Sequence, residues 1–200
     1  MGTVSPVVTR VSDAGRGRVA VELDGSPWRV LPLEAVARSG LDVGVAVDRP
    51  RARRVRAELR RAEALAVAAR SLRYRDHSRQ SLADRLARSR VDATSGDEAL
   101  STLERLGLLD DGRAALARAT ALAARDAGDL FIEVDLEQRG FGERDVAAAI
   151  AALEPEAARV ERIVARRGAS ARTIRRLRAK GFAADALETL IADEQPNELG

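Results

Sequence analysis

The sequence contains no cysteine, which excludes disulfide bonds, thiolate zinc sites and cysteine nucleophiles. His77 is the only histidine, so a metal site with two histidine ligands cannot form. Aromatic residues make up 2% of the chain, and any core must therefore consist of Leu, Ala, Val and Ile. This composition favours packed helices over a large β-sandwich or barrel.

Long apolar runs are also missing. No segment approaches the roughly 20 apolar residues that span a bilayer. The first residues, Met1–Pro6, lack the charged and apolar regions of a signal peptide. We therefore expect a cytoplasmic protein that has no contact with a membrane.

Catalytic motifs are absent as well. There is no Gly-x-Ser-x-Gly elbow and no Walker-type phosphate loop, and Gly15–Arg18 is better interpreted as a hairpin loop. His77 lies in an arginine-rich turn, which favours a residue on the surface over a member of a catalytic triad. We expect no enzymatic activity, no cofactor and no bound metal.

Charge is present in abundance, and its sign alternates along the chain although the net charge is only +3. Residues 51–90 hold thirteen basic and four acidic residues, a balance of +9, and residues 91–158 have a balance of −9. Residues 159–182 return to +8, and the tail from residue 183 has −5. Two basic lobes around an acidic one suit a polyanion or a partner with alternating charge. Neutralisation between lobes of the same chain is the alternative.

Residues 1–50 predict a small β-rich module, since they contain four of the six prolines and several glycines. We expect strands over Val4–Val11, Val19–Leu23, Trp28–Leu31 and Val43–Val47, with a hairpin turn at Asp24 and Gly25. A short helix over Leu33–Ser39 should end at Gly40.

From residue 51 onward the pattern is helical, and no proline occurs between Pro50 and Pro155. The first helix has apolar residues on one face, and they are Val55, Leu59, Ala62, Leu65, Ala69 and Leu72. Its first half carries six arginines, the wrong charge for a helix N-terminus, so stability alone does not explain them. They are Arg51, Arg53, Arg54, Arg56, Arg60 and Arg61.

The predicted helices form three sets of three, and the corners between them are marked by Ser78, Gly96, Gly107, Gly128, Gly140, Pro155, Gly168 and Gly181. The first set covers residues 51–74, 79–89 and 97–106. The second covers 110–127, 129–139 and 143–153, and the third covers 156–167, 171–180 and 184–194. These predictions divide the chain into four modules, which are the β-rich module (1–50) and helical repeats 1 (51–107), 2 (108–154) and 3 (155–200).

The later sets share a spacing. Leu136, Gly140, Phe141, Val146 and Ile150 are placed like Leu177, Gly181, Phe182, Leu187 and Ile191. Such a period of 40–50 residues is typical of stacked helical units that share one core. Plain core packing accounts for Phe141 and Phe182.

Gly107–Asp111 combines a helix end with a helix start. Gly107 can adopt the left-handed conformation that ends a helix, and Leu108 and Leu109 should lie under the turn. Asp110 or Asp111 can accept hydrogen bonds from the free N–H groups of the next helix.

Two groups of basic residues are the candidate binding sites, because arginine suits phosphates and carboxylates. The first group is Arg70, Arg73, Arg75 and Arg79. The second is Arg166, Arg167, Arg172, Arg175, Arg176, Arg178 and Lys180. No aromatic residue alternates with them, so they offer no stacking platform for single-stranded bases.

In order and spacing, the motifs resemble the RecX family, regulators of the bacterial recombinase RecA. Gly107–Asp111 matches the centre of the family without change. The residues that resemble the first-repeat motif of the family are Ala64–Arg70, Arg75–Ser78, Ser81, Leu82 and Leu86. Those that resemble the second-repeat motif are Ile132, Leu136, Arg139, Gly140 and Phe141, and those that resemble the third are Leu177, Lys180, Gly181 and Phe182. Arg18–Val30 and Leu41–Val47 resemble a β extension of some members.

The sequence also departs from the family pattern. His77 replaces an arginine, and Ser81 replaces the glutamate that would complete a capping box with Ser78. Where the family has Phe-Ala after the pair of aspartates, this sequence has Ala114 and Ala115. Where the family has glycine at the first corner, this sequence has Arg90.

The resemblance implies a mainly α fold of three tandem three-helix repeats in an elongated, bent array after the β-rich module. It also implies a protein that binds in the groove of the RecA filament on single-stranded DNA and reduces strand exchange and ATP turnover. From the extended repeat architecture we expect a monomer. Such regulation belongs to homologous recombination, DNA repair and the SOS response. A basic helical module that binds single- or double-stranded DNA without a recombinase partner is the alternative. A helical adaptor for another protein is the third hypothesis.

Overall fold

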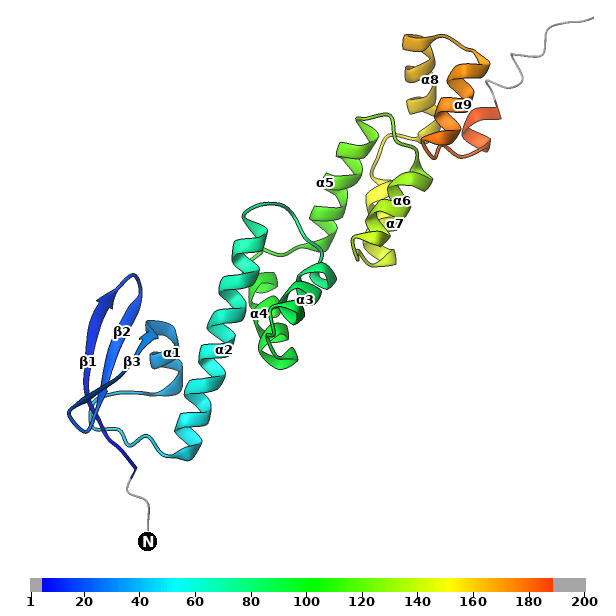
Figure 1. Ribbon diagram of the computed structural model, residues 1–200. Coiled ribbons are helices and arrows are strands. Elements are labelled where there is room, and N and C mark those ends of the chain that lie inside the picture. Colours follow the sequence, from blue (N-terminus) through cyan, green and yellow to red (C-terminus); the bar gives the residue numbers. More distant parts are fainter. Residues whose placement is uncertain (1–4, 189–200) are drawn as a thin grey trace, which may run out of the picture. The chain divides into compact units, whose positions relative to one another are not determined.

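The structure, a computed structural model, describes residues 5–188 (Figure 1). This part contains nine α-helices, one short 3-10 helix and one three-stranded sheet, which confirms the predicted mainly α class. The chain divides into two compact units. Unit 1 is residues 1–75 and 82–108, and unit 2 is residues 76–81 and 109–200.

The β-rich module opens unit 1 with an antiparallel sheet in the order β1-β2-β3. The strands are β1 (Val8–Gly15), β2 (Arg18–Leu23) and β3 (Ser26–Pro32). Asp24 and Gly25 have φ of 49° and 79°, as a tight hairpin turn requires. Helix α1 (Leu33–Ser39) ends at Gly40 in the left-handed conformation, so the predicted helix is confirmed.

The predicted strand Val43–Val47 is wrong. This segment is a loop that makes one isolated bridge, between Val7 and Ala46, and Val47 contributes to the core of the module. The first strand also starts later than predicted, at Val8, and continues to Gly15. Val4 lies outside the described residues.

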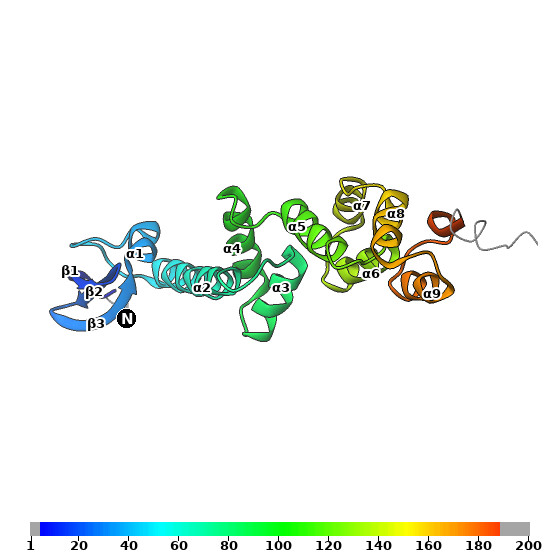
Figure 2. The ribbon, with the colours of Figure 1, turned by 90° about the horizontal axis from the view of Figure 1, so that it is seen from above.

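Helix α2 (Arg49–Leu72) buries different faces in its two halves. Its first half buries Val55 in the core of the β-rich module, whereas its second half buries Ala64 and Ala68 and packs against α4 (Ala93–Arg105). At 3.6 residues per turn these two faces lie on nearly opposite sides of the helix. Figures 1 and 2 show the sheet at the first half of α2 and α4 at the second. The single predicted face is therefore incomplete: beyond Leu59 its residues Ala62, Leu65 and Leu72 are half-buried, Ala69 is exposed, and the fully buried alanines lie on another face.

Helix α3 (Arg79–Arg88) begins where predicted, but α4 begins four residues earlier than predicted. Asp92 caps α4 by accepting a hydrogen bond from the Ser95 N–H at 3.0 Å. Gly96 is therefore no corner. It is a buried residue inside the helix, and a Cβ there would be in ordinary contact with Leu86 and Val91.

Unit 2 contains the remaining helices around two apolar clusters. The elements are α5 (Asp111–Ala123), α6 (Asp129–Gln138), α7 (Glu143–Ala151), α8 (Glu156–Arg167), α9 (Ala171–Ala179) and the 3-10 helix η1 (Asp185–Leu187). Ile132, Leu136 and Phe141 belong to the first cluster, and Leu177 and Phe182 belong to the second. The predicted helix 184–194 is described only as far as residue 188, and Ile191 lies outside the described residues.

The same corner ends the second helix of every repeat. Residues Arg90, Gly140 and Gly181 have φ of 60°, 77° and 79°, and the residue after each donates its N–H to a carbonyl five positions earlier. This is the Schellman pattern. Gly107 also has a positive φ of 67°, as predicted. Leu109 is buried, whereas Leu108 is exposed, so the prediction for Leu108 is wrong.

In unit 2 an acidic residue joins each repeat to the second helix of the repeat before it. Both carboxylate oxygens of Asp111, at the start of α5, accept the backbone N–H of Arg79 at 2.8 and 3.1 Å. Glu156, at the start of α8, accepts the N–H of Asp129 at 2.6 Å and that of Ala183 at 3.1 Å. Asp110 caps its own helix through the N–H of Arg113 at 2.9 Å. The two aspartates therefore cap two different helices.

The corner glycines allow the backbones of consecutive repeats in unit 2 to approach one another closely, and we call each such contact region a joint. The Lys180 and Gly181 carbonyls accept the N–H groups of Gly128 and Leu130 at 2.8 and 3.1 Å. A Cβ on Gly181 would lie 2.6 Å from the Phe131 nitrogen, so only glycine fits. In the joint before it, the Ser78 hydroxyl donates to the Arg139 carbonyl at 2.6 Å.

We expect Asp111→Ala to lower the free energy of unfolding of unit 2 by about 1 kcal/mol, because the first N–H of α3 loses its acceptor. Hydrogen exchange at the Arg79 amide should become faster. Glu156→Ala should do the same at Asp129. Glu143→Gln, which changes an exposed acid in the first turn of α7, is the control and should alter neither amide. Unchanged exchange at Arg79 in Asp111→Ala would contradict the capping role.

Candidate partner-binding surfaces

The outer face of α9 carries the densest group of predicted binding residues. Ser170 caps the helix by accepting the Thr173 N–H at 3.2 Å, and Ile174 and Leu177 turn inward to the core. The opposite arc of the helix therefore consists of arginines, because 3.6 residues per turn separates the two sets. The exposed residues are Arg172, Arg175, Arg176 and Arg178, and Lys180 is half-buried at the end of the helix.

These five side chains make no hydrogen bond or ion pair with any residue of the described part. Arg176 and Arg178 lie in the last turn, where positive charge is favourable beside the helix carbonyls. Local stability therefore accounts for the position of these two charges. It does not account for the whole arginine face.

The arginines of α8 are arranged differently, because acidic residues of unit 2 pair with them. Arg166 donates to Asp126 at 2.6 Å, and Arg167 lies 3.5 Å from the same carboxylate. Arg162 pairs with Glu154. Among the described residues, neutralisation within the chain thus applies to α8, and α9 carries the basic side chains of residues 159–182 that have no acidic partner there.

The first predicted group is split between the units. Arg70 and Arg73, at the end of α2, and Arg75 are exposed in unit 1. Arg79 is half-buried at the start of α3 in unit 2, where its backbone is held by Asp111. Arg79 therefore has a structural position in the joint, whereas the other three are available to solvent.

His77 is buried, with 6% of its surface exposed, so the prediction of a surface residue is wrong. Its Nδ1 lies 3.0 Å from the Ser81 hydroxyl. Ser78 next to it caps α3 by accepting the Ser81 N–H at 3.1 Å. Ser81 therefore takes part in this turn through its N–H and hydroxyl, although it cannot supply the carboxylate of a capping box.

Arg159 was not distinguished from its basic neighbours in sequence, yet it is only 2% exposed. Its guanidinium donates to the carbonyls of Glu154 at 3.0 Å and Ala127 at 2.9 Å, and to the carboxylate of Asp129. The cation also lies 5.7 Å from the centre of the Phe182 ring. One signal was available, because Arg159 lies four positions before the apolar Ile163 and therefore shares its face of the helix.

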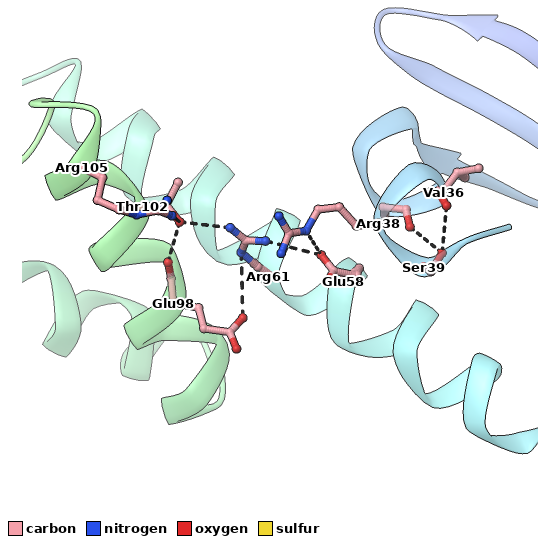
Figure 3. Close-up of polar contacts among 9 residues, drawn as sticks. Val36, Arg38, Ser39, Glu58, Arg61, Glu98, Thr102 and Arg105 are labelled. Atoms are coloured by element: carbon pink, nitrogen blue, oxygen red, sulfur yellow. Dashed lines mark hydrogen bonds and ion pairs between the residues drawn. The ribbon is translucent and has the colours of Figure 1, made fainter.

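A second buried arginine, Arg61, holds α2 to α4 in unit 1. Its Nη2 donates to the Thr102 hydroxyl at 3.1 Å, and Glu58 and Glu98 lie 3.6 and 3.9 Å from other guanidinium nitrogens (Figure 3). Glu58 also accepts a hydrogen bond from Arg38 of α1 at 2.8 Å. This cluster is balanced in charge and connects three helices, so we assign it a structural role.

Asp135 links α5 and α6 by two arginines. It accepts hydrogen bonds from Arg118 at 2.8 and 2.9 Å and from Arg139 at 2.7 Å. The hydrogen bonds from Arg118, followed by those from Arg139, lower the pKa of the Asp135 carboxyl from its ordinary value to about 2.

The described residues hold no group of three possible metal ligands, and none of their helices is long and apolar enough to cross a membrane.

Arg159→Met should lower the free energy of unfolding of unit 2 by about 3 kcal/mol or more, because it leaves buried carbonyls and Asp129 without a partner. Circular dichroism during urea unfolding measures this loss. Fluorescence of Trp28, which lies in unit 1, should change little. Arg162→Met is the matched control on the same helix and should cost less than about 1 kcal/mol, since Arg162 is an exposed partner. Equal effects of both variants would contradict the special role of Arg159.

Asp135→Asn should destabilise unit 2 by about 2 kcal/mol at pH 7, since a shift of one pKa unit is worth about 1.4 kcal/mol. The folded pKa is below the unfolded one, so the stabilisation is complete above about pH 4 and is lost as the pH falls toward 2. Urea unfolding at pH 7, 4 and 2.5 should show the difference between wild type and variant shrinking with acidity. A difference that stays constant over this range would contradict the assignment.

The sequence matches no family model and no curated protein. Solved structures do resemble it. Regulatory protein RecX matches 94% of this chain with 99% of its own length, a TM-score of 0.79 and 19% sequence identity. RecX from Lactobacillus salivarius matches 67% of this chain with 96% of its own length, a TM-score of 0.55 and 20% identity. The chain therefore has the fold of the RecX regulatory proteins.

Proposed function

We propose that this protein regulates the RecA recombinase by binding RecA filaments on single-stranded DNA. The observation that carries the proposal is the RecX fold over 94% of the chain. The motifs that resemble the family add support, and Gly107–Asp111 has a defined place in that fold as the corner and double cap between repeats 1 and 2. The proposed regulation is negative, so strand exchange and ATP turnover decrease.

The arginine face of α9 is the proposed filament contact in unit 2. Its four arginines are exposed and lack partners in the described part of the chain, so their charges are available to carboxylates of a protein or phosphates of DNA. An exposed ion pair contributes only about 0–1 kcal/mol. Binding of useful strength therefore needs many such contacts, and several protomers of a filament can supply them.

The exposed residues Arg70, Arg73 and Arg75 are the proposed contact in unit 1. Arg166 and Arg167 contribute less, because their pairing with Asp126 must be weakened before they bind a partner. Binding that rests on exposed charges is sensitive to salt. The proposed complex should therefore dissociate as ionic strength rises.

RecA ATPase and strand exchange, each titrated with this protein, test the proposal. We expect inhibition by the wild type and at least tenfold weaker inhibition by Arg172→Glu/Arg175→Glu/Arg176→Glu, because the variant places negative charge on the α9 face. Co-sedimentation with RecA filaments at 50 and 300 mM NaCl should show binding that is lost at the higher salt.

The matched control is Arg88→Glu/Arg125→Glu/Arg144→Glu, which reverses the same number of exposed charges at scattered positions. It should inhibit as the wild type does, and circular dichroism should show both variants folded. Absence of filament binding at low salt would reject the proposal. Binding to bare DNA without any effect on RecA ATPase would favour the DNA-binding module instead.

A further inference from the structure

One row of arginines on α2 belongs to neither of the two basic groups above. Arg49, Arg53, Arg56 and Arg60 follow one another at intervals of four, three and four residues, so they share one face of the helix. We call this row the α2 stripe. With a rise of 1.5 Å per residue it extends for about 16 Å along the axis, with one guanidinium every 5 to 6 Å. All four residues are exposed.

The α2 stripe lies on a different side of the helix from Val55, which faces the β-rich module. Ala64 follows Arg60 by one turn on the same side and begins the segment that packs against α4, so the stripe ends where that packing starts and its four arginines stay exposed. Arg60 pairs with Asp92, the cap of α4, at 2.9 Å. The side chains of Arg49, Arg53 and Arg56 make no hydrogen bond or ion pair within the described residues.

This arrangement opposes the stability of the helix. The first turn of α2 has no acidic residue, and the positive end of the helix dipole repels Arg49. Like charges three and four residues apart also repel one another. The nearby carboxylates have other partners. The Oδ1 of Asp48 accepts the Arg51 N–H at 2.8 Å as the helix cap, and Glu58 pairs with Arg38 and Arg61.

The chemistry of the face indicates a polyanion. No large apolar side chain is exposed along the described length of α2, so the stripe lacks the apolar centre that protein interfaces have. No aromatic residue lies among Arg49–Arg60, so bases of a single strand would find nothing to stack on. Phosphates on the outside of a duplex need only charge and guanidinium hydrogen bonds.

We propose that the α2 stripe binds the phosphate backbone of double-stranded DNA, without sequence specificity. This inference goes beyond the proposed function, since it requires no recombinase. It assigns DNA contact to unit 1, whereas the α9 face of unit 2 is the proposed filament contact.

Fluorescence anisotropy with a labelled 20-base-pair duplex and the full chain, in the absence of RecA, tests the inference. Arg49→Gln/Arg53→Gln/Arg56→Gln should bind at least tenfold more weakly than the wild type at 50 mM NaCl. The slope of log K against log salt concentration should fall by about 0.9 for each phosphate that the variant no longer neutralises. The midpoint of thermal unfolding should stay the same or rise, because the substitutions remove repulsion from the start of α2.

The matched control is Arg88→Gln/Arg125→Gln/Arg144→Gln, which removes the same charge from exposed positions elsewhere. It should retain affinity within about threefold and keep the salt slope. Equal reductions of affinity in both variants, or absence of duplex binding by the wild type, would overturn the inference. So would tighter binding to a single strand of the same length, or equally tight binding to polyglutamate. Because RecA is absent, failure here leaves the result of the ATPase assay unaffected.

Discussion

The carboxylate at the start of each later repeat is the interaction on which the arrangement of unit 2 depends. Asp111 and Glu156 each accept the first N–H of the second helix of the preceding repeat. That N–H has no partner inside its own helix, so the acceptor must come from elsewhere. The corner glycines then bring the backbones close enough for direct hydrogen bonds. Apolar packing supplies much of the stability, whereas these polar contacts set the register between repeats.

Arginine has three different uses in this chain, and burial and partners separate them. Arg159 and Arg61 are buried and connect helices from inside. Arg162, Arg166 and their neighbours pair at the surface. The arginines of α9 and of the α2 stripe are exposed, and most of them lack partners in the described part. The number of arginines in the sequence therefore overstates the basic surface that is available to a partner.

Much of the fold could be predicted because its signals are local. Gly107, Gly140 and Gly181 have left-handed backbone conformations that favour glycine, and Asp24 with Gly25 determines a hairpin. What escaped prediction depends on contacts distant in sequence. The burial of Arg159 requires the Ala127 carbonyl and Asp129, and that of His77 accompanies a joint to a later repeat. Gly96 looked like a corner, but Asp92 starts α4 before it.

The two faces of α2 show a further reason for errors. A single periodic pattern assumes one neighbour along the whole helix, but α2 has the β-rich module at one half and α4 at the other. The sequence showed which residues are basic, but it did not show which of them are exposed and which have structural partners. Sequence identifies arginines, and only the fold distinguishes Arg79 in a joint from Arg70 in solvent.

Arg90 distinguishes the first helical repeat from the two that follow it. A Cβ on Gly181 would collide with the backbone of the preceding repeat, and one on Gly140 would be in tight contact with Gln80, whereas Arg90 adopts the same left-handed conformation while exposed. The first repeat thus lacks the surface with which later repeats join a predecessor. In repeat proteins the terminal unit is a cap. The first repeat accordingly has the character of such a cap, because it presents an exposed charged side chain where the later repeats present a glycine against their neighbour.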